Sequence, residues 1–148
     1  MQQVKLLMVC LGNICRSPLA QGILESKVDT EKILVDSAGT AAYHIGSPPD
    51  PRSIAIAKKY GIDLSSQRAR QFRREDFTIF SKIYVMDHAN YKNIIALAQS
   101  EKEREKVALI LSDNREVPDP YYGGEEGFQS CFDLLDEACE RIKESYSL

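Results

Sequence analysis

Residues 4–18, VKLLMVCLGNICRSP, decide the fold class of this chain. The apolar run at 4–9 is typical of a buried strand in a parallel sheet. From Ser17 onward the apolar residues recur at helical spacing, with Ser17 as a candidate N-cap and Pro18 in the first turn. Residues 10–17, which we call the cysteine loop, are therefore expected to join the end of a strand to the start of a helix.

The same alternation of strand and helix continues along the chain. Apolar runs at 32–38, 82–87 and 107–111 are typical of further strands, and helical patterns lie between them and in the C-terminal tail. This order predicts an α/β fold with a parallel sheet. Ligands of such folds bind at the carboxyl ends of the strands, so the cysteine loop occupies the expected position of a site.

Length and composition limit the classes of function. The 148 residues fit a single domain, residues 1–148, with one core. Because 43% of the residues are hydrophobic and 28% are charged, the composition is that of an ordinary globular protein. The formal net charge of −3 gives no reason to expect a nucleic acid or a membrane surface as a partner.

The N-terminal sequence and the cysteines predict the compartment. No apolar run approaches the roughly 20 residues that span a bilayer. The segment MQQVKLLMVCLGN lacks the longer apolar core and the small-residue cleavage site of a signal peptide. We therefore expect a cytoplasmic protein whose four cysteines are thiols. None of them forms C-x-x-C or a zinc-binding spacing, so no metal is expected.

The cysteine loop has the residues of an anion site. A helix N-terminus offers unpaired N–H groups and a positive dipole end. Gly12 allows close approach of the backbone, Asn13 tolerates a left-handed conformation, and Arg16 offers a planar fork for two phosphate oxygens. Cys10 would lie beneath the bound phosphorus, where the dipoles and the Ser17 hydroxyl favour a nucleophilic thiolate.

Two residues have simpler interpretations when each is taken alone. A single cysteine at a strand end is more often a small core residue, and it is the whole loop that favours an anion site over that interpretation. Protonation of a leaving oxygen requires an acid, and Asp119, in the sequence VPDPYYGG at 117–124, is the candidate. An Asp-Pro pair alone more often forms a turn. Its position beside Tyr121 and Tyr122, after the fourth strand, makes Asp119 a site candidate.

VCLGNICRSP together with DPYYG resembles the low-molecular-weight protein tyrosine phosphatases, and the resemblance covers nearly the whole chain. Five further stretches have the order and spacing of that family: DSAGT (36–40), SPPDPR (47–52), RARQF (68–72), EDF (75–77) and MDHAN (86–90). The resemblance implies a three-layer sandwich, in which a twisted four-stranded parallel sheet has helices on both faces. It also implies a phosphatase that needs no cofactor.

By that resemblance each site residue has an expected role. Cys10 is the nucleophile, Arg16 binds phosphate and the transition state, and Asp119 is the general acid and then the base. Ser37 hydrogen-bonds the loop asparagine. The remaining members of the phosphate-binding loop are Leu11, Gly12, Asn13, Ile14, Cys15 and Ser17.

The expected pocket wall is apolar and aromatic, which suits a phenyl ring. The wall candidates are Leu11, Ile14, Tyr43, Tyr121 and Tyr122. A related branch that hydrolyses phosphoarginine has threonine where this chain has Ile14, so Ile14 favours phosphotyrosine. Two positions depart from better-known members: Tyr43 replaces a tryptophan, and Gln67 replaces a histidine that supports the loop asparagine.

The other thiols and the histidines are less informative. Cys15 could form a reversible disulfide with Cys10, mainly by resemblance, or could pack the loop as a small buried residue. Cys131 and Cys139 fall on the apolar face of the last helix and are expected in the core. His44 neighbours a wall candidate, and both a position at the rim of the site and an ordinary surface position stay open.

The predicted partners are a phosphotyrosine protein or peptide as substrate and inorganic phosphate as product, with a monomer or weak self-association as the oligomeric state. Two rival functions stay open. An arsenate reductase shares this fold and the C-x5-R loop, but it needs further cysteines to relay a disulfide from Cys10. A phosphotyrosine-binding module without activity would be expected to lack Cys10, Arg16 or Asp119, and all three are present.

Overall fold

The computed structural model describes residues 3–146, with the side chain of Tyr122 excepted. Four strands form one sheet in the order β2-β1-β3-β4, and all three pairings are parallel. The strands are β1 (Val4–Cys10), β2 (Ile33–Gly39), β3 (Lys82–Val85) and β4 (Val107–Leu109). The predicted four-stranded parallel sheet is confirmed, with each strand within one or two residues of its expected bounds.

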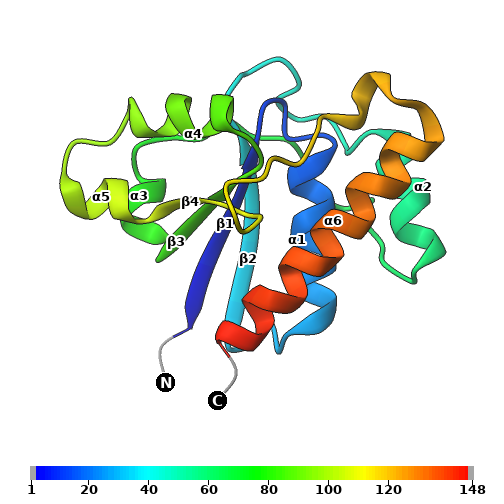
Figure 1. Cartoon of the computed structure of the whole chain (residues 1–148), viewed down its shortest axis with the longest axis horizontal. Coiled ribbons are helices and arrows are strands. Elements are labelled where there is room, and N and C mark those ends of the chain that lie inside the picture. Colours follow the sequence, from blue (N-terminus) through cyan, green and yellow to red (C-terminus); the bar gives the residue numbers. More distant parts are fainter. Residues whose placement is uncertain (1–2, 147–148) are drawn as a thin grey trace.

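Helices cover both faces of the sheet, which confirms the three-layer sandwich (Figure 1). One face carries α1 (Arg16–Lys27), α2 (Pro51–Lys59) and α6 (Gly124–Ser145). The other side carries three shorter helices: α3 (Asp76–Ile79), α4 (His88–Ile95) and α5 (Glu101–Glu105). A 3-10 turn, η1 (Pro120–Tyr122), precedes α6 and lies near the end of the sheet where β1 enters α1.

The central strand β1 is buried on both faces. Leu6 and Met8 belong to the hydrophobic cluster under α1 and α6, while Leu7 and Val9 belong to the cluster on the opposite face. All four side chains have no exposed surface, and each such burial is worth about 1.5–3 kcal/mol. This packing holds the carboxyl end of β1, which carries Cys10, in one place.

The last helix buries two of the four thiols, as expected. Cys131 and Cys139 have 2% and 0% of their surface exposed and lie in the cluster shared with α1. Burial raises the pKa of each thiol to about 12. Both are therefore neutral core side chains at physiological pH.

The prediction that Ser17 is the N-cap of the first helix is wrong. Helix α1 begins at Arg16, its N-cap is Cys15, and no side chain caps it. Ser17 lies inside the first turn, where its Oγ contacts the Asn13 amide and the Cys10 sulfur. The hydroxyl serves the cysteine loop instead of the helix end.

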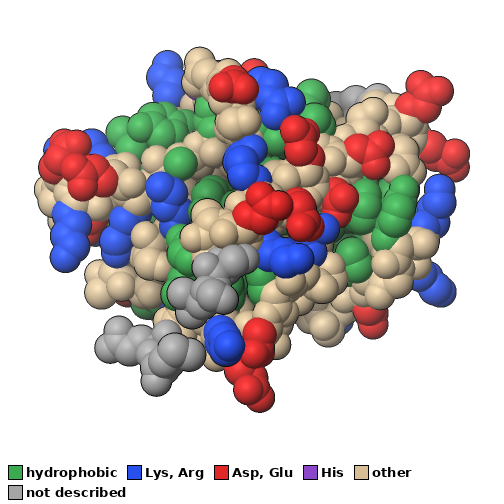
Figure 2. All heavy atoms as spheres, turned by 60° about the horizontal axis from the view of Figure 1, so that its bottom comes forward, with side chains coloured by type: hydrophobic (Ala, Val, Ile, Leu, Met, Phe, Trp, Pro, Cys, Tyr) green, Lys and Arg blue, Asp and Glu red, His purple; other side chains and the backbone are tan. Residues whose placement is uncertain are grey.

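The face at which the chain ends lie carries charges of both signs. Figure 2 shows Lys and Arg interspersed with Asp and Glu over this face. The ammonium group of Lys27 lies 3.0 Å from the carboxylates of both Asp136 and Glu140. Within residues 3–146, no helix is long and apolar enough to cross a membrane.

Candidate active site

The peptide carbonyls of the cysteine loop are tied to the chain that follows β2. Those of Cys10, Leu11 and Ile14 accept backbone N–H groups from residues 40, 41 and 50 at 2.9, 2.9 and 2.8 Å. In a trans peptide the N–H points opposite to the C=O. Carbonyls that are anchored on the outside therefore turn loop N–H groups toward the inside. The start of α1 adds its own unpaired N–H groups, so the loop interior suits an anion.

Asn13 holds the loop in a left-handed turn. Its φ is 56°, a conformation that asparagine adopts more readily than most residues. Its amide nitrogen donates to the hydroxyls of Ser17 at 2.8 Å and Ser37 at 3.0 Å, and its oxygen accepts from the N–H of Arg70 at 3.0 Å. Ser37 in turn donates to the side-chain oxygen of Gln21 at 2.7 Å. The asparagine is 2% exposed, so these contacts are shielded from water.

Cys10 ends β1 at the floor of the site. Its sulfur lies 3.0 Å from the Ser17 hydroxyl oxygen. The residue as a whole is 3% exposed. Either the sulfur or the hydroxyl oxygen can donate the hydrogen bond between them. When Cys10 is a thiolate, the Ser17 hydroxyl is the donor, and its oxygen accepts from the amide of Asn13.

Arg16 is fixed from behind the site. One terminal nitrogen donates to the Asp87 carboxylate at 2.7 Å and to the Val117 carbonyl at 2.9 Å. The other terminal nitrogen lies 3.8 Å from a carboxylate oxygen of Asp119. The arginine is only 2% exposed, so a charged side chain is held in one orientation at the edge of the cavity. Phosphate geometry suits such a planar fork.

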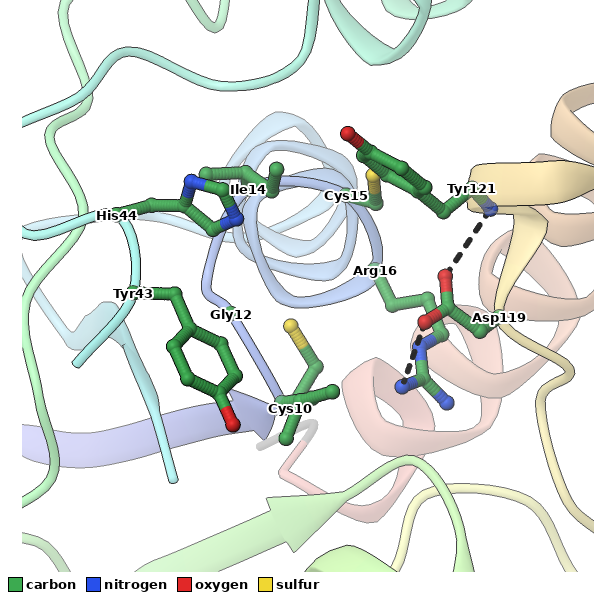
Figure 3. A pocket seen from close by; sticks show the side chains of 10 residues that line it. Cys10, Gly12, Ile14, Cys15, Arg16, Tyr43, His44, Asp119 and Tyr121 are labelled. Carbon is green, nitrogen blue, oxygen red and sulfur yellow. Dashed lines mark hydrogen bonds and ion pairs between the residues drawn. The ribbon is translucent and has the colours of Figure 1, made fainter. Parts of the chain in front are cut away.

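Asp119 faces Arg16 across the cavity mouth, as Figure 3 shows. One of its carboxylate oxygens accepts the N–H of Tyr121 at 3.0 Å and caps η1. The side chain is 43% exposed, so the carboxyl group is open to an incoming molecule. This placement suits a proton donor at the entrance of the cavity.

A cavity of about 250 Å³ joins these groups. Its lining is formed by Cys10, Leu11, Gly12, Ile14, Cys15, Arg16, Tyr43, His44, Asp119 and Tyr121. In Figure 3, Tyr43 and His44 lie on one side of the cavity, and Tyr121 and Asp119 on the other. The His44 ring packs on the loop backbone, since a Cβ added at Gly12 would lie 3.0 Å from its Cδ2. The expected wall residue Tyr122 has a side chain outside the described residues.

Cys15 lines the same cavity but differs chemically from Cys10. It is 4% exposed, and burial followed by the charge of Asp50 raises its pKa to about 12. Cys15 is therefore a neutral thiol at physiological pH. Both thiols are free in this structure.

Three residues that support the site had no role in the sequence interpretation: Asp87, Arg70 and Arg52. Each lies in a stretch that resembled the family without an assigned function, namely MDHAN, RARQF and SPPDPR. Gln67 also has a different hydrogen-bond partner from the one expected. Its amide donates to the Pro18 carbonyl at 3.2 Å. The contacts of Asn13 come from the two serines and the Arg70 backbone instead.

Among the described residues, no group of three or more His, Cys, Asp or Glu side chains is placed to hold a metal ion. The positive groups around the cavity are the Arg16 guanidinium and the N–H groups of the cysteine loop. The expectation of a reaction without metal or cofactor stays a prediction.

Comparisons with known proteins identify the family. The family model described as low molecular weight phosphotyrosine protein phosphatase matches residues 5–147. A putative low molecular weight protein-tyrosine-phosphatase of Synechocystis is 47% identical over 148 residues, covering 94% of this chain and 94% of that protein. A protein tyrosine phosphatase from Entamoeba histolytica superimposes with a TM-score of 0.88 at 38% identity, over 95% of this chain and 94% of that one.

A Drosophila arginine phosphatase superimposes with a TM-score of 0.89 at 29% identity, over 98% of this chain and 99% of that one. The fold is thus shared by proteins that are named for different phosphatase substrates. The family match over nearly the whole chain and the 47% identical relative agree with each other. The chain therefore belongs to the low molecular weight phosphotyrosine protein phosphatase family, and the prediction of an enzyme of this class is confirmed.

Proposed function

We propose that residues 1–148 form a single phosphatase domain that hydrolyses phosphotyrosine in proteins or peptides through a cysteinyl-phosphate intermediate. The observation that carries this proposal is the placement of three groups around one cavity: the Cys10 sulfur, the Arg16 guanidinium and the Asp119 carboxyl. They correspond to a nucleophile, an anion clamp and a proton donor.

The first displacement forms the intermediate. The Cys10 thiolate attacks phosphorus, an S–P bond forms, and the P–O bond to the tyrosine ring breaks. Asp119 gives its proton to the departing phenolate oxygen. Arg16 and the loop N–H groups hold the equatorial oxygens, where charge is spread in the transition state.

The second displacement releases phosphate. Asp119, now a carboxylate, removes a proton from a water molecule whose oxygen attacks phosphorus. The S–P bond breaks, the Cys10 thiolate is restored, and inorganic phosphate leaves. The Ser17 hydroxyl, 3.0 Å from the sulfur, stabilises the thiolate both before attack and as a leaving group.

The lining of the cavity favours an aromatic substrate. Tyr43 and Tyr121 face the cavity from opposite sides, where they can contact a phenyl ring (Figure 3). Ile14 adds apolar surface and has no group to pair with the guanidinium of phosphoarginine. Phosphotyrosine is therefore the favoured substrate over phosphoarginine, although a structural relative is named an arginine phosphatase.

Several finer expectations stay predictions: a cytoplasmic location, weak self-association, and a Cys10–Cys15 disulfide that protects the nucleophile. The rival functions meet different obstacles. Cys131 and Cys139, which would have to relay a disulfide in an arsenate reductase, are buried in the core. A binding module would not need Asp119 at the cavity mouth.

The test is hydrolysis of a phosphotyrosine peptide by the reduced protein in the presence of a metal chelator. We expect turnover by the wild type, none by Cys10→Ser, and retained turnover by the control Cys139→Ala, whose thiol is buried away from the cavity. Phosphoarginine is run in parallel and is expected to be the poorer substrate. Failure of the reduced wild type to hydrolyse the peptide would refute the proposal, and thiol-dependent arsenate reduction would then favour the reductase.

A further inference from the structure

Arg52 stands outside the cavity, in the first turn of α2, yet it contacts the segment that carries Asp119. Its guanidinium forms three hydrogen bonds to the Asp50 carboxylate and Tyr121 carbonyl: Nε and one terminal nitrogen bind Asp50 at 3.0 and 2.9 Å. The other terminal nitrogen donates to the carbonyl of Tyr121 at 2.8 Å. One side chain thus links the N-cap of α2 to η1.

The same guanidinium lies over two aromatic rings. Its central carbon is 5.1 Å from the centre of the Tyr121 ring and 4.6 Å from that of Phe128. Both distances are within the range of cation–π contacts. Because Phe128 belongs to α6 and Tyr121 to η1, Arg52 connects three elements that meet beside the cavity mouth.

We propose that Arg52 is a positioning residue that holds Asp119 in place for proton transfer, an inference that rests on the proposed general-acid role of Asp119. The link is short. Tyr121 gives its N–H to the Asp119 carboxylate at 3.0 Å and its C=O to Arg52 at 2.8 Å. Fixing the Tyr121 backbone therefore fixes the donor that orients the acid.

The segment needs such an external restraint. It is followed by Gly123 and Gly124, and Gly124 has a φ of 67°, so the backbone beside η1 has few steric limits of its own. Asp119 has 43% of its side chain exposed, and its distance to Arg16 is 3.8 Å, longer than a direct hydrogen bond. Without Arg52, the Tyr121 carbonyl loses the hydrogen bond that ties this turn to α2.

Arginine suits this role better than lysine. The planar fork donates to two acceptors in different directions while its central carbon lies over two rings. An ammonium group cannot stack on both rings and donate to both acceptors at once. Arg52→Lys is therefore expected to restore only part of the function that Arg52→Gln removes.

The experiment measures how kcat/KM depends on the leaving group. kcat/KM reports the steps up to cysteinyl-phosphate formation, in which Asp119 protonates the leaving oxygen. Phenyl phosphate needs this proton, whereas a dinitrophenyl phosphate does not, because its phenolate is a stable anion. A misplaced acid lowers kcat/KM for phenyl phosphate by about 10–100-fold, since a displacement of about 1 Å costs that much. The dinitrophenyl ester changes by less than about threefold on the same argument.

The readout is the ratio of the two kcat/KM values within one enzyme sample. A partly unfolded preparation lowers both values equally and leaves the ratio unchanged, so the test survives a loss of stability in the variant. Arg104→Gln is the matched control, because Arg104 pairs only with Glu101 in α5 in the described contacts. Its ratio is expected to equal that of the wild type.

Asp119→Asn, alone and combined with Arg52→Gln, completes the design. We expect Asp119→Asn to change the ratio strongly. Arg52→Gln should add nothing in that background, because both substitutions impair the same proton transfer from Asp119 to the leaving oxygen. A ratio unchanged by Arg52→Gln, or an effect that adds in full to that of Asp119→Asn, would overturn the role of Arg52. A ratio unchanged by Asp119→Asn itself would instead overturn the proposed acid, so the two failures are distinguishable.

Discussion

Replacing Asp87 by serine is expected to destabilise the folded protein by about 3 kcal/mol, since removal of one partner of a buried ion pair costs about 3–5 kcal/mol. The affected group is the Arg16 guanidinium, whose side chain is 3% exposed and whose 2.7 Å contact with Asp87 is its closest ion pair. The variant leaves this cation with the Val117 carbonyl at 2.9 Å and the Asp119 carboxylate at 3.8 Å.

The lower end of the range applies because Asp87 is 21% exposed, so water can reach the space that its carboxylate leaves. Serine is chosen because Asp87 has a second function. Its other oxygen accepts the N–H of Asn90 at 2.8 Å and caps α4. Serine retains an N-cap oxygen, whereas Asp87→Ala loses the cap as well, at a further cost of about 1 kcal/mol. Comparing the two variants separates the contribution of the ion pair to stability from that of the helix cap.

The assay is urea unfolding of the wild type and both variants under reducing conditions. With a slope of about 2 kcal/mol per molar, a loss of 3 kcal/mol lowers the midpoint by about 1.5 M urea. Asp87→Asn has one amide oxygen, which can retain the cap only with the NH2 group turned toward Arg16, so this variant is expected to be no more stable than the serine variant. Equal slopes are required for the comparison, because a change in slope would indicate an altered unfolded or native state.

A loss of less than about 1 kcal/mol in Asp87→Ser would refute the reasoning, since this is the size of a solvent-exposed pair. It would mean that Arg16 finds water or another acceptor, and that its orientation does not depend on Asp87. An equal loss in the serine and alanine variants would show that the cap contributes nothing.

Gly39→Ala is expected to lower stability by about 1–3 kcal/mol and to reduce kcat/KM, because its Cβ would lie 2.9 Å from the Leu11 carbonyl oxygen; unchanged values in urea unfolding and phosphotyrosine kinetics would contradict this. His88→Gln tests a pH-dependent contact. Hydrogen bonds that the protonated ring donates to the Asn114 amide oxygen and then to the Glu116 carboxylate raise the pKa of His88, so its contribution is fully present below about pH 6 and is lost as pH rises past the raised value. The wild type and the variant should differ most in melting temperature at acidic pH, and a difference that grows toward alkaline pH would refute the sign. The pH profile of kcat/KM is expected to be bell-shaped with an acidic to neutral optimum, because one group must be a thiolate while another is a protonated carboxyl; a rate that rises steadily above neutral pH would exclude the carboxyl as acid.

The sequence predicted those parts of the fold that depend on local pattern. The four strands and the long helices follow from apolar periodicity, and the cysteine loop follows from Cys10 and Arg16 at the end of the first strand. The helix start was misplaced because a serine before a proline suits an N-cap, while the competing contacts of Ser17 with Cys10 and Asn13 depend on the folded loop. Periodicity carries no information about such contacts.

The supporting residues could not be predicted for a related reason. Asp87 lies 71 positions from Arg16 in the chain, and Arg70 lies 57 positions from Asn13. A sequence without its fold does not state which distant carboxylate or backbone N–H reaches a loop. Gln67 was expected to support the loop asparagine by resemblance, yet its amide contacts the Pro18 carbonyl, and the oxygen of Asn13 accepts from the Arg70 backbone.

The register of the sheet explains how these distant groups reach the cysteine loop. Strands β1 and β2 pair in parallel with Cys10 opposite Gly39, so the chain that leaves Gly39 runs beside the loop that leaves Cys10. The backbone N–H groups at 40 and 41 thereby meet the first two loop carbonyls. On the other edge of β2, Gly39 exchanges hydrogen bonds with the 70–72 segment at 2.8 and 2.7 Å, which brings the Arg70 N–H to the oxygen of Asn13.

A slip of β2 by one residue would turn its side chains to the opposite face and displace both sets of contacts together. The outward carbonyls would lose their donors, and the N–H groups that line the loop interior would no longer be held in place. The C-x5-R spacing therefore specifies the proposed reactive groups, while the geometry of the proposed anion site depends on the pairing of β1 with β2. For this reason we expect substitutions at the carboxyl end of β2, which lie behind the loop, to affect phosphate binding as strongly as substitutions within it.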